Sequence, residues 1–559
     1  MFSFSFNSLP QRFAFDARKS SFALLFFAAF LALSAAPNFA QTETDGNLRK
    51  QAAKAMRKGE FAEAEKIWRV LLDGEPDNYK YRLALSHSLY KQRFLIESYN
   101  EARKVAEAEP KNARAYALIG ASLLSAGNFK QAKEAFYTAL SLDEEEPLAL
   151  AGAAMLDFHE NRAAWGFARI HQAIQLEPRE PDFVYYLAQV AVRTEKYNEA
   201  AQAYERFLQI APNTDVDRRE RIKGLISFLR YLGAQSKLFT IEGKRQTAIK
   251  MEIVNNRPII TVKINEHDEP LRFVLDSGSA VTVISDTTAK RLGIKEVARG
   301  GKARAIGGEG KFNIVYGFLN SLHIGDVKIN KVPVYIRKFH NYSEVIDGYI
   351  GISLISKFMT TLDYGNQVFS LVRQEKNKKT ETDAIPSSAD GLSIPLRITT
   401  SGFLSGEVKI DSVPEALNFI IDTGASVSVV SSVTTKYYQL NRFVEPTIMR
   451  VFGAAGVTEN VTALNLPRLD FGLHSQEKIQ AAVLDLEAIN ETSGFEQSGI
   501  LGGNFLKNYR LTFDFDAISC QLIKLFARDL FRRIHRRRLL DFAAKIPQNR
   551  FKFIRRKIS

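Results

Sequence analysis

The feature that most constrains the fold is an internal duplication in the second half of the chain. Residues of the same type recur there at a common offset of 146 positions. The first copy holds Val262, Asp276, Ser285, Arg304, Gly307 and Gly310, and the second holds Val408, Asp422, Ser431, Arg450, Gly453 and Gly456. Short apolar runs with glycine turns surround both copies, a pattern typical of β-strands. The sequence therefore predicts two like-folded β units after a boundary near residue 240.

Each copy carries an apolar strand that runs into an Asp-Ser/Thr-Gly loop, in the segments 273–279 and 419–425. Each copy also has, further along, an apolar pair followed by glycine: Tyr349-Ile350-Gly351 in the first and Ile500-Leu501-Gly502 in the second. A single Asp-Ser/Thr-Gly arises by chance in ordinary chains and then marks a turn. Two copies in register, with the same flanking strands, argue against that interpretation.

These elements resemble the retropepsin-like (gag-pol-type) aspartic peptidases, in two tandem copies over about residues 251–526. The resemblance implies an all-β, bilobal retropepsin/pepsin-like acid protease fold with Asp276 and Asp422 as the catalytic pair. Two carboxyls held close together cannot both ionise, so one donates a proton while the other deprotonates water. Because both copies lie in one chain, pairing within the chain is expected, while pairing between two chains stays open.

The resemblance also implies roles for other residues at matching positions. These are the active-site loop residues Ser277, Gly278, Thr423 and Gly424, the crossing-strand glycines Gly351 and Gly502, and the flap glycines Gly307, Gly310, Gly453 and Gly456. The hydroxyls are expected to brace the two loops against each other, and the loop glycines let backbone N–H groups approach the carboxylates. The flap glycines have a simpler interpretation as hairpin turns, and neither segment shows the flap tyrosine that pepsin-like lobes carry.

A shorter period organises the first half, where prolines fall on a 34-residue grid that only Glu144 interrupts. The grid positions are Pro76, Pro110, Pro178 and Pro212. Together with recurring small and aromatic residues, this resembles the tetratricopeptide repeat (TPR), an all-α solenoid of about five units. Helix pairs of this kind bury their apolar faces only against their neighbours. The resemblance implies a surface for a protein partner, with a spacer role as the alternative, and the amphipathic stretch 217–232 is expected to cap the array.

Charge and the two ends of the chain bear on location. The net charge is +14, but the tail 528–559 supplies +10 of it, so the body is nearly neutral and no nucleic-acid surface is expected. Arg18 and Lys19 precede an apolar run over 22–33, the layout of a secretory signal peptide. We therefore expect export, to the periplasm of a bacterial cell, with an uncleaved inner-membrane anchor as the alternative. The basic tail could lie on an anionic membrane surface or remain solvated.

Metal and cofactor chemistry has no support in the sequence. The chain has one cysteine, Cys520, and none of its eight histidines lies in an H-E-x-x-H motif, so we expect neither a metal nor a cofactor. The expected order is a leader (1–40), repeats (45–214), a capping helix and linker (215–240), a first lobe (250–373), a linker (374–390), a second lobe (391–527) and the tail (528–559).

The function predicted from these patterns is an aspartic-type endopeptidase, a hydrolase acting on peptide or protein substrates with the repeats recruiting a protein partner. The alternative from another class is a non-catalytic peptide- or protein-binding scaffold with a degenerate protease fold. A further alternative is a precursor that processes its own tail or linker.

Overall fold

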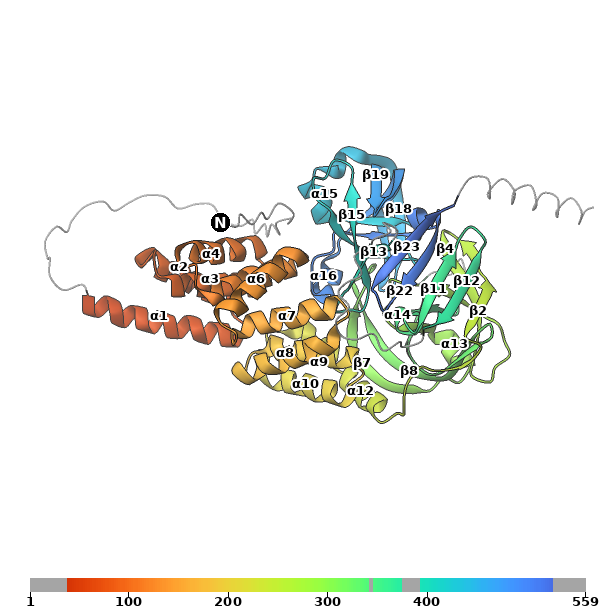
Figure 1. The fold of residues 1–559 in the computed structure, drawn as a ribbon, viewed down its shortest axis with the longest axis horizontal. Coiled ribbons are helices and arrows are strands. Elements are labelled where there is room, and N and C mark those ends of the chain that lie inside the picture. The colour runs from red at the N-terminus through yellow and green to blue at the C-terminus, as the bar shows by residue number, and fades with distance from the viewer. Residues whose placement is uncertain (1–37, 341–344, 375–392, 526–559) are drawn as a thin grey trace, which may run out of the picture.

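The computed structural model describes residues 38–340, 345–374 and 393–525 (Figure 1). The predicted leader, apart from residues 38–40, and the whole basic tail lie outside the described residues. So does nearly all of the linker between the lobes. Within the described part, no helix combines the length and the apolar character needed to cross a bilayer.

The first half folds into five antiparallel helix pairs, as the 34-residue period predicts. The helices are α1 (Asn38–Lys58), α2 (Phe61–Gly74), α3 (Tyr79–Lys91), α4 (Leu95–Ala108), α5 (Ala113–Ser125), α6 (Phe129–Leu142), α7 (Pro147–His159), α8 (Ala163–Leu176), α9 (Pro181–Arg193) and α10 (Tyr197–Ile210). Phe136 shows why small residues recur, because its buried ring lies between Gly120 and Gly152 and leaves no room for a Cβ at either. The aromatic ring of α6 thus fills the space between its partner helix α5 and helix α7 of the next pair.

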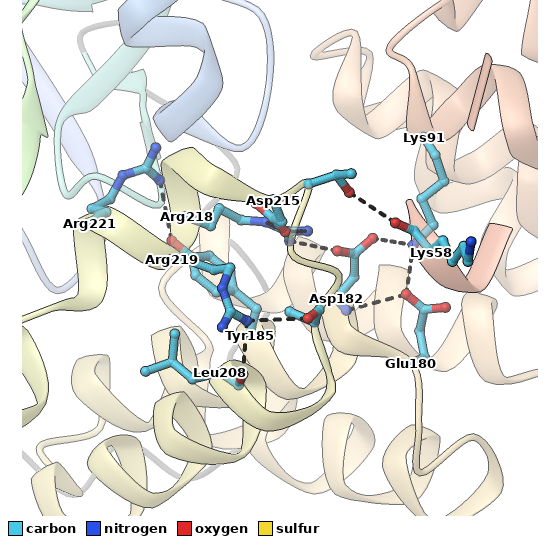
Figure 2. A network of polar contacts seen from close by, with 12 residues as sticks. Lys58, Lys91, Glu180, Asp182, Tyr185, Leu208, Asp215, Arg218, Arg219 and Arg221 are labelled. Carbon is cyan, nitrogen blue, oxygen red and sulfur yellow. Dashed lines mark hydrogen bonds and ion pairs between the residues drawn. The ribbon is translucent and has the colours of Figure 1, made fainter. Parts of the chain in front are cut away.

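The repeat array curls until its two ends meet. Lys91 of α3 forms ion pairs with Glu180 (2.6 Å) and Asp182 (2.5 Å) near the start of α9, and Asp182 also binds Arg218 at 2.6 Å (Figure 2). Burial alone would lower the pKa of Lys91, but the two carboxylates outweigh it and raise that pKa. The Thr214 hydroxyl donates to the carbonyl of Lys58 at 3.1 Å. The inner surface of the array lines a cavity of about 1000 Å³, to which residues of the second lobe also contribute, and these ion pairs lie in its wall.

The predicted cap over 217–232 is broken into two helices, α11 (Val216–Ile222) and α12 (Leu225–Gly233). Gly224 separates them with a φ of 77°, which L-residues with a side chain rarely adopt, and a Cβ there would approach the Arg299 carbonyl to 2.7 Å. The break has a physical reason, because it lets the chain fit against the first β lobe. Phe228 of α12 then packs on Tyr316, with ring centroids 4.5 Å apart.

Each β lobe is a closed barrel. The first contains β1 (Thr240–Gly243), β3 (Glu252–Val254), β4 (Arg257–Ile264), β5 (Leu271–Leu275), β6 (Thr282–Ser285), β7 (Glu296–Arg304), β8 (Lys311–Ile324), β9 (Val327–Arg337) and β10 (Gly348–Ile350), with α13 (Asp286–Arg291) and α14 (Ile352–Ile355). Pairing of β8 with both β4 and β9 closes the barrel. The β structure begins at Thr240, earlier than the predicted start of the lobe at 250.

The second lobe repeats this plan. It contains β14 (Arg397–Ile398), β15 (Leu404–Ile410), β16 (Leu417–Ile421), β17 (Ser428–Ser431), β18 (Val444–Gly453), β19 (Gly456–Phe471), β20 (His474–Leu484) and β21 (Gly499–Leu501), with α15 (Ser432–Tyr437), the 3₁₀ helix η1 (Leu440–Phe443), α16 (Glu487–Ser493) and α17 (Gly503–Leu506). Pairing of β19 with both β15 and β20 closes its barrel.

A six-stranded sheet built from both halves joins the lobes. It consists of β2 (Gln246–Lys250), β11 (Phe358–Asp363), β12 (Val368–Arg373), β13 (Ser393–Pro395), β22 (Tyr509–Asp514) and β23 (Ser519–Lys524), in the order β13-β23-β22-β11-β12-β2. Strands β11 and β22 pair directly, so main-chain hydrogen bonds join the two lobes in this structure. The prediction of a helical repeat scaffold followed by a bilobal β fold is confirmed.

The array contacts both lobes (Figure 1). The second lobe is held by His159 at the end of α7, whose Nδ1 lies 2.5 Å from the Ile398 carbonyl and whose ring meets Phe129 and Phe495 edge to face. Burial lowers the pKa of His159 to about 4. No sequence motif marks this histidine, which lies at the interface between the array and the second lobe.

Candidate active site

The two Asp-Ser/Thr-Gly loops lie at the interface between the lobes and are built alike. Strands β5 and β16 each run into their aspartate, whose backbone N–H donates to the neighbouring strand: Asp276 to the Ile350 carbonyl and Asp422 to the Leu501 carbonyl, both at 3.0 Å. The crossing strands can pass this closely because Gly351 and Gly502 follow them. A Cβ at either glycine would come within 2.7 Å of the backbone of Val281 or Val427.

Four reciprocal hydrogen bonds join the loops through Ser277 and Thr423. The Ser277 hydroxyl donates to the Ile421 carbonyl at 2.8 Å and accepts from the Thr423 N–H at 3.0 Å. The Thr423 hydroxyl donates to the Leu275 carbonyl at 2.7 Å and accepts from the Ser277 N–H at 3.1 Å. Both side chains are buried, so each bond satisfies a backbone group that water cannot reach. The hydroxyls hold the two loops against each other.

This bracing brings the two carboxyls side by side. A Cβ built on Gly424 would lie 2.6 Å from the Asp276 carboxyl carbon, and one on Gly278 would overlap the Asp422 carboxyl. The absence of a side chain at these two glycines therefore provides the space for the opposite aspartate. Asp276 accepts the Gly278 N–H at 2.9 Å, while Asp422 accepts Gly424 N–H at 2.8 Å and Ala425 N–H at 3.0 Å.

The two aspartates differ in their electrostatics. Burial, together with the charge of Asp422 and a hydrogen bond to it, holds the pKa of Asp276 well above its usual range, although Gly278 N–H and Arg337 oppose this. Burial also raises the pKa of Asp422, but the hydrogen bonds from Asp276, Gly424 and Ala425 oppose it. Asp422, with more donors, is the better site for the negative charge and Asp276 the better site for the shared proton.

The predicted flap segments are the tips of two long hairpins, β7–β8 and β18–β19, and these tips touch. Ala455 N–H donates to the Ile306 carbonyl at 2.9 Å, and Gly308 N–H donates to the Val457 carbonyl at 3.3 Å. Each tip also reaches the other lobe: Ile306 packs on an apolar cluster of the second lobe, and Ala454 accepts a bond from Arg337 at 3.0 Å.

The structure places the predicted site residues at the aspartate loops and at the tips of the two hairpins. The aspartates and the loop residues Ser277, Gly278, Thr423 and Gly424 meet at the interface, and Gly351 and Gly502 lie directly behind them. Gly307, Gly453 and Gly456 lie where the hairpin tips touch. Gly310 does not reach the other hairpin, because the nearest atom to a Cβ there is Ala488 of α16, at 3.5 Å.

Sequence reasoning missed Arg337, whose pKa burial lowers and whose guanidinium lies close enough to Asp276 to affect the pKa of that carboxyl. It lies at the end of β9, where no motif marks it. In the described part of the chain, no group of three or more acidic, histidine or cysteine side chains could hold a metal ion. Cys520 is buried in β23, and burial raises the pKa of its thiol.

Comparisons with known families agree with this geometry. Residues 260–354 match the family model for an aspartyl protease, and residues 407–508 match that for a gag-polyprotein aspartyl protease. Residues 113–146 and 182–214 match the tetratricopeptide repeat model. The search among curated proteins found no match.

Solved structures similar to parts of the chain fall into the same two groups. An aspartic proteinase from Irpex lacteus shares 13% identity, with 50% of this chain and 97% of that chain covered and a TM-score of 0.33. A thermophilic TPR protein from Thermus thermophilus shares 17% identity over 31% of this chain and 95% of that chain, with a TM-score of 0.28. From the family models, the chain carries tetratricopeptide repeats followed by two aspartyl protease domains.

Proposed function

We propose that the protein is an aspartic-type endopeptidase in which Asp276 and Asp422 act as one catalytic pair. The observation that carries the proposal is the meeting of two equivalent loops, joined by reciprocal hydroxyl bonds, with their carboxyls adjacent and buried. Two such carboxyls share one proton, because the second ionisation would place like charges together away from water.

In this mechanism, ionised Asp422 takes a proton from a water molecule as the water oxygen attacks the carbonyl carbon of the peptide bond. Protonated Asp276 donates a hydrogen bond to the carbonyl oxygen, where negative charge develops. Collapse of the tetrahedral intermediate breaks the C–N bond, and the proton held by Asp422 passes to the leaving nitrogen. The amide donors Gly424 and Ala425 favour the ionised form of Asp422 that the first step needs.

The two hairpins are proposed to act as paired flaps. Because their tips touch each other and reach across the lobe interface, they would have to separate to admit a chain and would then exclude water on closing. The fold itself does not establish catalysis, so the dyad requires a direct test.

The test replaces each aspartate alone, as Asp276→Asn and Asp422→Asn, and measures cleavage of an unfolded test protein over a range of pH. Either substitution removes one partner of the shared proton, so both are expected to reduce cleavage to background. Activity retained in one variant would refute a shared dyad. Peptide binding without turnover by the unsubstituted protein at every pH would instead support the non-catalytic scaffold.

We also propose that the repeats recruit a protein partner. The inner surface of the array is partly occupied by its own ion pairs, because Asp182 already pairs there with Lys91 and Arg218. Breaking such buried pairs is costly, so a partner would engage the outer helices or a segment narrow enough to enter the cavity. Pull-down with the full chain and with a Lys91→Met variant would separate these two modes.

We infer export, from the leader, to the periplasm of a bacterial cell, with retention at the inner membrane as the alternative. The basic tail is proposed to contact anionic lipid. Fractionation of expressing cells, followed by mass analysis of the mature N-terminus and of the tail, would test both proposals and also reveal self-processing.

A further inference from the structure

Strand register defines the face of the first lobe that carries Asp276. Tyr349 of β10 lies in register between Val274 of β5 and Val283 of β6. Asp276 is two residues beyond Val274, and Arg337 of β9 pairs with the residue two beyond Val283. Since alternate residues of a strand point to the same face, Asp276, Tyr349 and Arg337 share one face.

The same register identifies the positions of the second lobe that match Tyr349 and Arg337. A third matching pair of positions lies at the start of the strand that pairs with the other edge of each aspartate-bearing strand, β4 beside β5 and β15 beside β16. The three positions hold Arg257, Arg337 and Tyr349 in the first lobe, and Phe403, Leu484 and Ile500 in the second. The duplicated dyad is therefore flanked by a cationic, aromatic wall on one side and an apolar wall on the other.

Tyr349 contacts both arginines of the first lobe. The Arg337 guanidinium lies 5.7 Å from the Tyr349 ring centroid and 4.9 Å from that of Phe339, and the two rings meet edge to face at 5.1 Å. Arg257 hydrogen-bonds the Tyr349 hydroxyl. In the second lobe, by contrast, Leu484, Ile500 and Phe403 belong to a separate apolar cluster that also receives Ile306 of the opposite hairpin.

Arg337 lacks a dedicated counter-ion. Among the described residues, no ion pair within 4.0 Å involves it, and its guanidinium donates to a neutral acceptor, the Ala454 carbonyl, at 3.0 Å. A half-buried guanidinium remains charged and is stabilised by an anion more than by a carbonyl. Asp276 is the nearby carboxyl, and it is the member of the dyad better suited to hold the proton.

Space is available beside this guanidinium. A cavity of about 420 Å³ lies between α13, the hairpin β7–β8 and the end of β9, and its lining includes Arg337, Lys338, Phe312 and Ala454 of the opposite hairpin. Its two acidic lining residues are Asp286 and Glu296, which already pair with Lys290 and Arg299. The cavity therefore retains an excess of positive charge at its Arg337 end.

We propose that Arg337 and Arg257 form a carboxylate-binding subsite beside Asp276, so that the protein cleaves peptides with an acidic residue on one side of the cleaved bond and an apolar residue on the other. This proposal rests on the proposed endopeptidase function and adds its substrate class. A planar guanidinium fits a carboxylate through two parallel N–H bonds. The carboxylate could also be the C-terminus of a short peptide.

The first test maps cleavage sites in a proteome-derived peptide library with the full-length protein, using mass spectrometry. We expect Asp or Glu to be enriched on one side of the cut and Leu, Ile or Phe on the other. Matched fluorogenic peptides with Glu, Gln or Leu at the acidic position then give ratios of kcat/KM. The preference for Glu over Gln should fade below about pH 4, where the Glu side chain of the substrate becomes protonated. Paired peptides ending in a free carboxylate or an amide separate a side-chain from a C-terminal carboxylate.

The second test gives the first lobe the side chains of the second, as Arg337→Leu with Arg257→Phe. A hydrogen-bonded charge contributes about 1.5–3 kcal/mol, so the Glu:Leu ratio of kcat/KM should fall at least about ten-fold. Arg337→Lys keeps the charge and should keep part of the preference. Lys263→Leu removes an equal charge from an exposed ion pair on the same lobe and should leave the ratio unchanged.

The outcomes separate the two proposals. Cleavage of many peptides without acidic enrichment, or a Glu:Leu ratio unaffected by the double substitution, overturns the subsite and leaves the dyad standing. No cleavage of any peptide by the unsubstituted protein overturns the endopeptidase function and the subsite with it. Cleavage that persists in Asp276→Asn shows that the dyad assignment is at fault.

Discussion

An arginine ties the hairpin of the first lobe to the helical array, whereas the matching arginine of the second lobe pairs only within its own hairpin. Arg304 of β7 pairs with Asp217 of α11 at 2.5 Å and with Glu491 of α16 at 2.8 Å, and its side chain is 15% exposed. Arg450, its counterpart at the offset of 146, pairs at 2.8 Å with Glu459 of its own hairpin and is 58% exposed. The same residue type thus anchors one flap and lies exposed on the other.

This difference separates the parts of the two copies that have stayed alike from the parts that have diverged. The hydroxyl bonds of Ser277 and Thr423 are equivalent in the two lobes because a shared proton requires two matching supports. The hairpins and the walls of the cleft have no such requirement, and there the lobes have diverged according to what they contact. We infer that the second hairpin is the one that moves when the flaps separate, because an exposed pair within one hairpin restrains it little.

The largest expected effect tests the part that the lobes share. In Gly278→Ala or Gly424→Ala, the new methyl group would occupy the space of the opposite carboxyl and displace it. A shift of about 1 Å costs on the order of 10²-fold in rate, so both variants should lose at least that much kcat while remaining folded. Gly74→Ala, where nothing lies within 4 Å of the new methyl, serves as the control. Loss in only one of the two active-site variants would show that the carboxyls do not oppose each other symmetrically.

These loops were predictable from the sequence, whereas the surroundings of the site were not. The motif at Asp276 and Asp422 is local and duplicated, so its offset alone located both loops. Lys91 and Asp182 gave no comparable signal, because their contact depends on the curvature accumulated over several repeats. Arg257 could have been noticed, since the aligned position in the second copy is Phe403, but a single break in a repeat carries meaning only once the strand register is known.

The first two strands, β1 and β2, were not predicted from the sequence, for a different reason. Strand β1 is short and buries none of its four residues, and β2 buries one, Thr247, so neither shows the alternation of apolar residues that marks a strand. Their partners are distant, β9 for β1 and β12 for β2, and those pairings define them. The role of Gly224 could not be predicted either, because it depends on how closely its backbone approaches β7.

The next effect tests whether the loops support each other equally. Ser277→Ala and Thr423→Val each leave a buried N–H and a buried carbonyl without a partner, at about 1–3 kcal/mol per group, so each should lower the free energy of unfolding by about 3 kcal/mol. Thr423→Ser keeps the hydroxyl and should recover most of that loss. Urea unfolding followed by circular dichroism measures all three variants. If the losses of unfolding free energy in Ser277→Ala and Thr423→Val differ by more than about 1 kcal/mol, the two hydroxyls do not support the loops equally.

A smaller effect compares how the lobes dock on the array. His159 has a folded-state pKa of about 4, against about 6.5 when unfolded, because it is buried against the second lobe. Between these values the unfolded state binds more protons, so stability should fall as the pH drops from about 6.5 to 4, by about 2–3 kcal/mol in total. His159→Phe should remove this pH dependence. Phe228→Leu, at the first-lobe contact, should lower stability equally at pH 7 and pH 4. Fluorescence of Trp68 and Trp165, both in the array, follows the unfolding.

The smallest effect returns to the two hairpins. Arg304→Gln removes the link to α11 and α16, and the resulting loss of about 1 kcal/mol should raise hydrogen exchange at 304–311 about five-fold. Arg450→Gln breaks an exposed pair and should change exchange at its own tip less than two-fold. Hydrogen exchange read by mass spectrometry on both variants, with the unsubstituted chain as reference, gives the comparison directly. Equal changes at the two tips would mean that the array does not anchor the first hairpin, and the assignment of the second as the moving flap would then be lost.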